Sequence, residues 1–298
     1  MALATKLLVR RLAIFCCRPV VQTSGQQSVL AATRVVVGAL RQTQVIIHNF
    51  WKVPLALIIP AMAATSPETQ KLLDEADELY NKKDFPATYD LLISHKDSND
   101  ANILWRLARA TTDKGKMHEG DERKKLIYEA WGYITKALEL DDTNFSCHKW
   151  YGILLDYTGE YEGTKQKIAN AFKVKEHFLK AIELNPKDAT SMHCMGVWCF
   201  TCADLPWIQR KMAAVVFASP PTSTYEEALE HFKNAEEASP GFYNNNLVML
   251  GKTYLRLKNK EEAKKYLLKA LEHQDKTTDD AKARKEATEL LKELGVKV

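Results

Sequence analysis

Cysteine is scarce in this chain, which has six among its 298 residues. Two are adjacent near the start, one stands alone and three share one short segment: Cys16, Cys17, Cys147, Cys194, Cys199 and Cys202. Small secreted domains that depend on disulfides carry cysteines more densely and at regular spacings. The sequence therefore excludes a disulfide framework and favours a reducing compartment.

Acidic residues are absent from residues 1–67, which contain seven Lys or Arg, whereas residues 68–298 contain 35 Lys or Arg and 38 Asp or Glu. The formal net charge of +4 thus comes from the tail, and the body alone carries −3. Nucleic-acid-binding domains usually have a basic surplus on the folded domain, because neutralising phosphates supplies most of their affinity. We therefore expect no nucleic-acid partner.

An uninterrupted apolar run is also lacking, since the nearest candidate, residues 45–63, is divided by polar residues and prolines. The interrupting residues are His48, Asn49, Lys52, Pro54 and Pro60. The stretch approaches the length of a membrane span, and its prolines disturb a helix. A membrane-associating segment there stays open as an alternative. With 46% apolar and 27% charged residues, the chain as a whole has the composition of a folded globular protein.

Residues 1–67 form a basic tail whose first part, Lys6 to Arg18, predicts an amphipathic helix with Leu8, Leu12 and Phe15 on one face. This composition is typical of a mitochondrial transit peptide, and the candidate targeting residues are Lys6, Arg10, Arg11 and Arg18. A secretory signal is disfavoured because two arginines interrupt its apolar core. A poorly ordered extension without a specific role is the remaining alternative.

The body, residues 68–298, contains internal repeats. When three junctions are aligned, Ala137, Ala181 and Ala235 coincide, and so do three glycines, at 152, 196 and 251. An Ala where the second helix of a pair meets its neighbour, a Pro-type turn and a small residue in the next helix together are typical of tetratricopeptide repeats. We therefore predict an all-α, tetratricopeptide-like helical-repeat solenoid.

Both ends of this solenoid are marked in the sequence. A degenerate first helix pair is expected from Glu75, after a helix start at Ser66-Pro67-Glu68. Thr224 with Glu227 forms a capping box, and Thr277 with Asp280 begins a final amphipathic helix. A polar closing helix of this kind caps the exposed end of a solenoid.

Two repeat steps are unusually long, at 44 residues from Ala137 to Ala181 and 54 from Ala181 to Ala235, against about 34 in standard repeats. Helical spacing from Ile168 to Ile182 predicts that the first excess lengthens the second helix of its unit. The second excess, residues 202–224, predicts a packed side helix.

No enzyme motif is complete. Gly251-Lys252-Thr253 resembles the end of a phosphate loop, but Asn246 stands where the loop needs glycine. Cys199 and Cys202, near His193 and Cys194, lack a second ligand pair, so core packing is the favoured interpretation over zinc or redox chemistry. Four histidines, at positions 148, 177, 193 and 231, lie 16 to 38 residues apart and have no matching nucleophile pattern. Tryptophans at 105, 131, 150, 198 and 207 are expected in the core. We predict no catalytic residues, no cofactor and no metal.

Lysines gather at two places that are candidates for a basic partner-binding surface. The first group is Lys165, Lys167, Lys173, Lys175 and Lys180, and the second is Lys258, Lys260, Lys264, Lys265 and Lys269. In the second group residues four apart share a helix face, which predicts a basic strip. A solvated face balanced by Glu261 and Glu262 is the alternative.

Several strings are more specific than a generic repeat. They are ILWRLARA from Ile103, SCHKWYGILL from Ser146, the long segment that begins at Ile168, LPWIQR from Leu205 and FASPPTSTYEEAL from Phe217. On these strings the chain resembles the regulator of microtubule dynamics family over residues 70–272. The resemblance implies a cytoplasmic protein at spindle microtubules and spindle poles, with mitochondrial association, and no enzyme activity.

Three hypotheses follow, and each can be tested. The first is a non-enzymatic scaffold that binds microtubules or a microtubule-linked protein. Because microtubule surfaces are acidic and the body is not basic overall, attraction must come from a local basic face, the tail or a partner. Salt screens charges that lie farther apart than about 8 Å, so a local basic face can act despite the net charge of the body. The second is a mitochondrial membrane-associated adaptor that binds lipid or peptide in the solenoid groove. The third is a thiol or zinc enzyme built on residues 193–202.

Overall fold

The computed structural model describes residues 66–216, 220–274 and 277–298, and the secondary structure of these residues is entirely helical. The helices are α3 (Pro67–Asn81), α4 (Phe85–Ile93), α5 (Ala101–Lys116), α6 (Gly120–Leu140), α7 (Phe145–Glu162), α8 (Thr164–Leu184), α9 (Ala189–Ala203), α10 (Trp207–Val216), α11 (Tyr225–Ala238), α12 (Asn244–Arg256), α13 (Lys260–Glu272) and α14 (Thr278–Glu293). Within these described ranges, none of the helices has both the length and the apolar character to cross a membrane.

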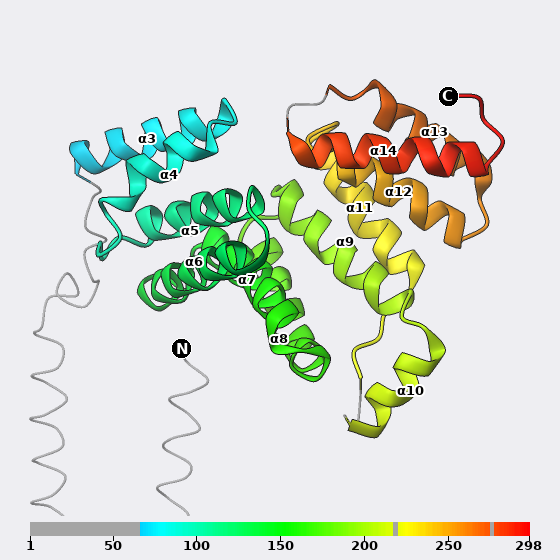
Figure 1. Ribbon diagram of the computed structural model, residues 1–298, viewed down its shortest axis with the longest axis horizontal. Coiled ribbons are helices and arrows are strands. Elements are labelled where there is room, and N and C mark those ends of the chain that lie inside the picture. The colour runs from blue at the N-terminus through cyan, green and yellow to red at the C-terminus, as the bar shows by residue number, and fades with distance from the viewer. Residues whose placement is uncertain (1–65, 217–219, 275–276) are drawn as a thin grey trace, which may run out of the picture. The chain divides into compact units, whose positions relative to one another are not determined.

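The helices pack as pairs, and the pairs stack into a solenoid (Figure 1). The pairs are α3 with α4, α5 with α6, α7 with α8, α9 with α11, and α12 with α13. The second helix of each pair also contacts the first helix of the next, as α6 contacts α7 and α8 contacts α9. This arrangement confirms the predicted all-α helical-repeat solenoid.

The aligned glycines explain how each pair closes. A Cβ placed on Gly152 would lie 2.6 Å from a ring carbon of Phe178, and one on Gly196 would lie 2.7 Å from Phe232. The equivalent distance at Gly251 is 2.6 Å, to Leu267. In each unit the glycine of the first helix therefore receives a large side chain of the second, because only a residue without Cβ leaves room for it.

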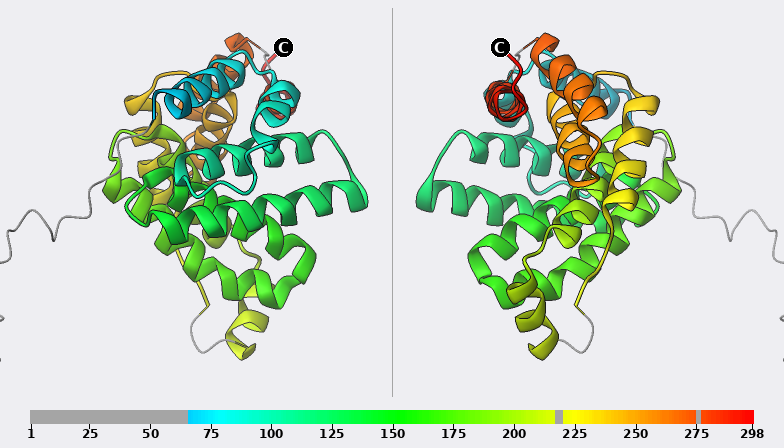
Figure 2. Two further views of the ribbon diagram at one scale, coloured as in Figure 1. Left: turned by 90° about the vertical axis from the view of Figure 1, so that its left-hand side faces the viewer. Right: turned by 90° about the vertical axis from the view of Figure 1, so that its right-hand side faces the viewer.

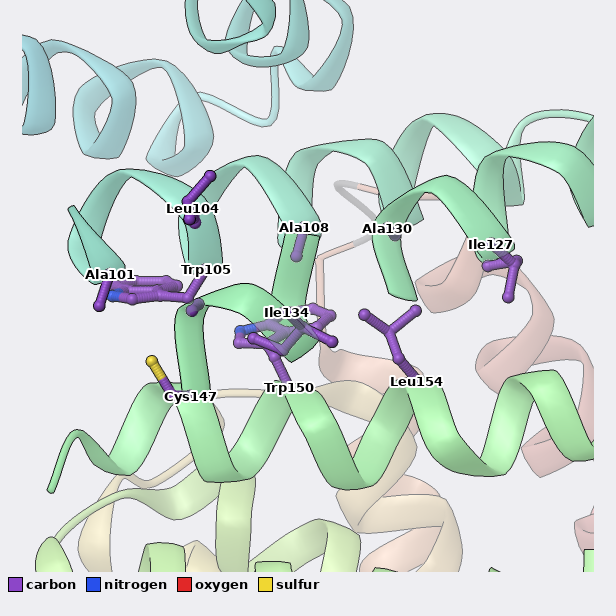
Figure 3. Packing of buried hydrophobic residues seen from close by; sticks show 11 residues of the cluster. Ala101, Leu104, Trp105, Ala108, Ile127, Ala130, Ile134, Cys147, Trp150 and Leu154 are labelled. Carbon is purple, nitrogen blue, oxygen red and sulfur yellow. The ribbon is translucent and has the colours of Figure 1, made fainter. Parts of the chain in front are cut away.

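The core consists of successive clusters along the stack, and neighbouring clusters share a helix. One cluster joins α5, α6 and α7 through Trp105, Ile134 and Trp150 (Figure 3). The next joins α7, α8, α9, α11 and α12, with Phe232 fully buried at its centre. A third joins α12, α13 and α14. Each unit thus buries its apolar face against a neighbour, as repeat proteins require.

The predicted helix starts are confirmed. Ser66 accepts a hydrogen bond from the backbone N–H of Thr69, with Pro67 in the first turn of α3. Thr224 and Glu227 form a capping box at α11. A second capping box begins α14, whose apolar side packs against α12 and α13 with the buried Leu291. Each such cap contributes about 1 kcal/mol to helix stability.

The long repeat steps become helix, as predicted, but not only in the second helix of the unit. α8 has 21 residues, and its partner α7 has 18; the length of α7 was not predicted from the repeat spacing. Two antiparallel helices must lengthen together if the added turns are to stay covered. The second excess contains α10, which confirms a helix there.

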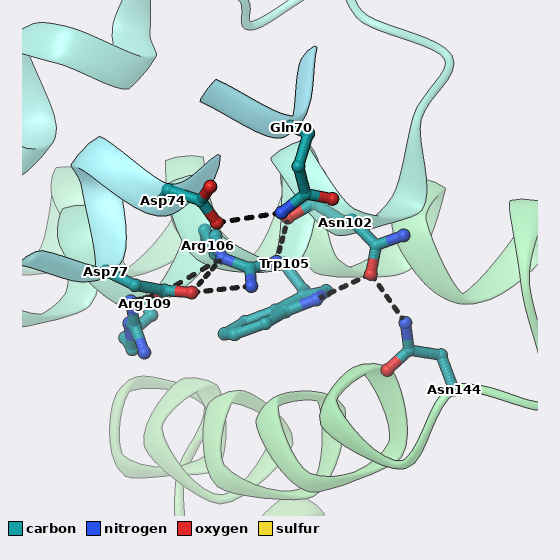
Figure 4. Close-up of polar contacts among 8 residues, drawn as sticks. All are labelled: Gln70, Asp74, Asp77, Asn102, Trp105, Arg106, Arg109 and Asn144. Carbon is teal, nitrogen blue, oxygen red and sulfur yellow. Dashed lines mark hydrogen bonds and ion pairs between the residues drawn. The ribbon is translucent and has the colours of Figure 1, made fainter. Parts of the chain in front are cut away.

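A charged cluster ties the first helix pair to the second (Figure 4). The Arg106 guanidinium donates to both oxygens of Asp77 at 2.7 to 3.1 Å, and Arg109 Nη2 donates to the same carboxylate at 3.0 Å. Burial opposes ionisation, but the two guanidinium groups hold the pKa of Asp77 below its usual value. Asp77 therefore fixes α3 against α5.

Candidate functional site

The predicted targeting residues Lys6, Arg10, Arg11 and Arg18, together with the stretch 45–63, lie outside the residues that the structure describes. Gly251-Lys252-Thr253, which only resembles the end of a phosphate loop, lies inside the repeat helix α12. What the described residues offer is a set of surfaces and a few buried polar groups.

The five lysines of α8 are divided by their contacts. Lys167 Nζ lies 3.7 Å from Asp156, and Lys180 Nζ lies 2.9 Å from Glu183. The Lys175 ammonium lies 4.9 Å from the ring centre of Trp198. Lys165 and Lys173 are exposed. The α8 group is therefore less basic than its composition predicts.

The second lysine group lies on α13 and in the turn that precedes it. Lys258, Lys260, Lys265 and Lys269 are exposed. Lys264 and Lys265 contact Glu261 at 3.3 Å and Glu262 at 3.1 Å, as the balanced-face alternative expects. The structure adds an aromatic component, because the rings of Tyr254 and Tyr266 stack with centres 5.6 Å apart.

This second group has lysines above its rings. The ammonium groups of Lys265 and Lys269 lie 5.6 and 5.4 Å from the centre of the Tyr266 ring. An ammonium at this distance is attracted to the face of the ring. We call Tyr254, Lys258, Lys260, Lys264, Lys265, Tyr266 and Lys269 the C-terminal basic surface.

The two lysine groups do not form one surface. α8 contacts α7, α9 and α10, whereas α13 contacts α12 and α14. A partner that uses both groups must therefore span at least one intervening unit.

One member of the C-terminal basic surface has an unusual backbone. Lys258 has φ of 61°, and Lys83 has φ of 65° at the equivalent turn between α3 and α4. The left-handed region favours glycine, and a non-glycine residue there costs roughly 1 kcal/mol. Lysine at these turns is therefore not explained by local stability.

The expectation that the tryptophans at 105, 131, 150, 198 and 207 all lie in the core is wrong for Trp207. Its relative exposure is 67%, whereas Trp105, Trp150 and Trp198 are buried. Trp207 begins α10, and the Lys211 ammonium lies 4.3 Å from its ring centre. The side helix is thus held at Ala213, which is buried, and presents its largest aromatic residue to solvent.

The structure brings together two histidines that the sequence showed only as separate. His148 Nε2 lies 2.8 Å from the Asp142 carbonyl, and the Nδ1 atoms of His148 and His177 lie 2.9 Å apart. Because a carbonyl only accepts, the neutral His148 carries its proton on Nε2 and accepts at Nδ1 from His177. Burial and the neighbouring His148 lower the pKa of His177 to about 4.

The cluster at residues 193–202 has the features of packing. His193 Nδ1 lies 2.9 Å from the side-chain oxygen of Asn246, and burial lowers the pKa of His193 to about 4. Burial raises the pKa of Cys194 and of Cys202 to about 12, and that of Cys199 in the same direction. The thiolate is the reactive and metal-binding form, so these thiols are poor nucleophiles and ligands at neutral pH. Among the described residues no group of three or more His, Cys, Asp or Glu side chains has metal-binding geometry.

A polar cluster links the first and last parts of the solenoid. Lys116 Nζ lies 3.2 Å from Asp113 in α5 and 3.9 Å from Asp279 at the start of α14. Burial lowers the pKa of Lys116, but the two carboxylates and the nearby Tyr157 and Tyr243 raise it more. No local sequence pattern could have found this cluster, because its members come from four different helix pairs or caps.

The comparisons with known proteins agree on family and fold. The sequence model described as Regulator of microtubule dynamics protein 1-3 matches residues 72–295. Regulator of microtubule dynamics protein 1 from Mus musculus is 49% identical over 233 residues, which are 78% of this chain and 76% of the relative. Protein 3 of the same name from Mus musculus is 36% identical over 229 residues, 75% of this chain and 48% of that protein.

Among solved structures, a thermophilic TPR protein of Thermus thermophilus aligns with a TM-score of 0.51 and 17% identity. The alignment covers 74% of this chain and 98% of that one. This likeness confirms the tetratricopeptide-like fold, and at this identity it shows the fold alone.

Proposed function

The chain belongs to the regulator of microtubule dynamics family, and from this premise we propose that it is a non-enzymatic interaction scaffold that binds microtubules, or a protein bound to them, through the C-terminal basic surface. The observation that carries the proposal is the exposure of Lys258, Lys260, Lys265 and Lys269 on neighbouring turns of one helix pair. The relatives' names support the microtubule role, and the repeat fold supports the scaffold role.

The electrostatics of this surface suit an acidic partner. Exposed charges act over about 8 Å at physiological salt, so the −3 charge of the whole body does not cancel a local group of lysines. Glu261 and Glu262 neutralise part of the group by pairing with Lys264 and Lys265. We infer that the exposed Lys258, Lys260 and Lys269 give the surface its positive charge. Tyr254 and Tyr266 add flat aromatic area, which protein interfaces favour.

The proposal of a non-enzymatic role is supported by the state of the candidate nucleophiles. The described cysteines have raised pKa values. His177 and His193, whose pKa values are lowered, are held by His148 and Asn246. These are structural hydrogen bonds within and between helix pairs.

Location is part of the proposal. We place the protein in the cytoplasm, on spindle microtubules and at spindle poles, and we assign mitochondrial association to residues 1–67. Imaging of full-length protein and of a form without residues 1–65, both tagged at the C-terminus, tests this. If both forms have the same distribution, the tail is not an address.

Co-sedimentation of the full-length chain with polymerised tubulin tests binding. Replacing Lys258, Lys260, Lys265 and Lys269 together with Gln should weaken binding about tenfold, if each exposed charge contributes a few tenths of a kcal/mol. The matched control replaces four exposed lysines elsewhere: Lys71, Lys124, Lys125 and Lys187. Equal weakening by both variants would show that general charge, and not this surface, carries the attraction.

A further inference from the structure

A second exposed surface, formed by α8 and α10, combines large apolar side chains with basic ones. Phe172, Leu179 and Trp207 have relative exposures of 46, 43 and 67%. Trp207 is the most exposed large apolar side chain in the described part of the chain. α10 lies against α8, so the three side chains belong to neighbouring helices.

The α8 side of this surface is a continuous stripe. Lys165, Phe172 and Leu179 follow one another at steps of seven residues, which is about two helical turns, so they line up along one side of the helix. Lys173 and Lys180 lie beside the two apolar residues. Glu176 and Glu183 lie on the same side, and Glu183 contacts Lys180 at 2.9 Å.

The α10 side has no acidic residue. The exposed basic residues of the two helices are Lys165, Lys173, Arg210 and Lys211. Lys167 and Lys180 contact carboxylates, and Lys175 lies at the Trp198 ring. The Arg210 guanidinium donates to the carbonyls of Ala203 and Leu205, which fixes the turn before α10 and with it the direction of Trp207. Lys211 lies over the Trp207 ring.

We propose that this α8–α10 surface docks on an anionic lipid bilayer, with Trp207 and Phe172 at the level of the headgroups. Tryptophan favours the interface because its ring is apolar and its N–H is polar, and lysines beside it reach the headgroup charges. Each lysine near an anionic leaflet adds attraction that salt weakens. A bilayer also suits the shape, since α10 projects from the helix stack (Figures 1 and 2).

This docking is independent of the proposed microtubule role, because it uses different helices. An acidic protein surface is the competing occupant. The aromatic content favours lipid, since apolar side chains gain from leaving water whereas a highly charged protein surface offers them little.

The first experiment locates Trp207. Full-length protein is mixed with vesicles of phosphatidylcholine and about a third phosphatidylserine, in which part of the phosphatidylcholine is brominated and quenches nearby indoles. We expect wild type to lose more tryptophan emission than Trp207→Phe does, because phenylalanine keeps the docking but removes the indole at the bilayer. Equal quenching would overturn the proposal even if the tail holds the chain on the vesicles.

The second experiment measures partition by flotation. Combined Phe172→Ser and Trp207→Ala should weaken binding to anionic vesicles on the order of tenfold for each side chain removed from the interface. The control is Met117→Ser, because Met117 is 61% exposed and lies just after α5. Because Trp207 is 67% and Phe172 46% exposed, we expect the melting temperature to change little. If the double variant keeps vesicle binding and loses microtubule pelleting, the surface serves an acidic protein and the proposal fails.

Discussion

Gly152 and Gly132 form a matched pair that tests how the helix pairs close. Both lie in helix interiors, where glycine to alanine gains about 1 kcal/mol by removing backbone freedom from the unfolded chain. A Cβ on Gly132 would meet nothing within 4 Å. A Cβ on Gly152 would lie 2.6, 2.9 and 3.3 Å from three carbons of the Phe178 ring, which is itself buried.

The clash between a Cβ at position 152 and the Phe178 ring decides which of the two variants is more stable. A buried ring cannot move by the needed distance without shifting α8, and overpacking of this kind costs about 1 to 3 kcal/mol. Since the backbone gain is common to both variants, Gly132→Ala should be more stable than Gly152→Ala by about 1 to 3 kcal/mol.

Urea unfolding followed by circular dichroism measures this difference. Adding Phe178→Leu to Gly152→Ala should recover part of the loss, because the smaller side chain makes room for the methyl group. If Gly152→Ala is as stable as Gly132→Ala, the glycines at 152, 196 and 251 are not needed for close approach and the account of the repeat is wrong.

Three further predictions concern the body. Lys258→Gly and Lys83→Gly should each raise the free energy of unfolding by about 1 kcal/mol, because both positions have positive φ. A lower melting temperature in either variant would refute this. Asp77→Ala should destabilise by about 2 kcal/mol, since it leaves two largely buried arginine side chains without a carboxylate. Asp74→Ala, which removes an exposed contact to Gln70, should change stability by less than about 0.5 kcal/mol. Burial lowers the pKa of His177 and of His193 to about 4, so the unfolded chain binds more protons than the folded chain between about pH 6.5 and pH 4. The free energy of unfolding should therefore be highest above pH 6.5 and fall as the pH drops through that window, and it should fall less steeply with pH in His193→Gln. An unchanged slope in this variant would show that His193 protonates freely in the folded chain.

The sequence predicted the repeat because the repeat depends on local pairs. Ala137, Ala181 and Gly152 are read from spacing alone, and the contacts that require them lie within one unit or between neighbours. The caps at Thr224 and Thr277 are local for the same reason, since the bonded groups are three residues apart.

Other features could not be predicted, because they depend on how helices are placed in space. Tryptophan is a residue type that usually lies in the core, and Trp207 is exposed because of the direction in which α10 projects. The approach of His148 to His177 depends on the register between α7 and α8. The pair of Lys116 with Asp279 depends on the curvature of the whole solenoid.

The lysine groups stand between these cases. Their positions along the helices were predictable, but the pairing of Lys264 with Glu261 and Lys180 with Glu183 depends on rotamers. The Tyr254–Tyr266 stack could have been suspected from the sequence, since both tyrosines fall near the lysines of one helix pair.

Fluorescence imaging of purified, labelled full-length protein on surface-bound microtubules tests the central claim most directly, because no linking protein is present. The account predicts decoration at low ionic strength that fades as salt rises, and little decoration by the variant with Gln at 258, 260, 265 and 269. Bare microtubules with wild type at low ionic strength, or equal decoration by wild type and variant, would contradict direct binding through the C-terminal basic surface.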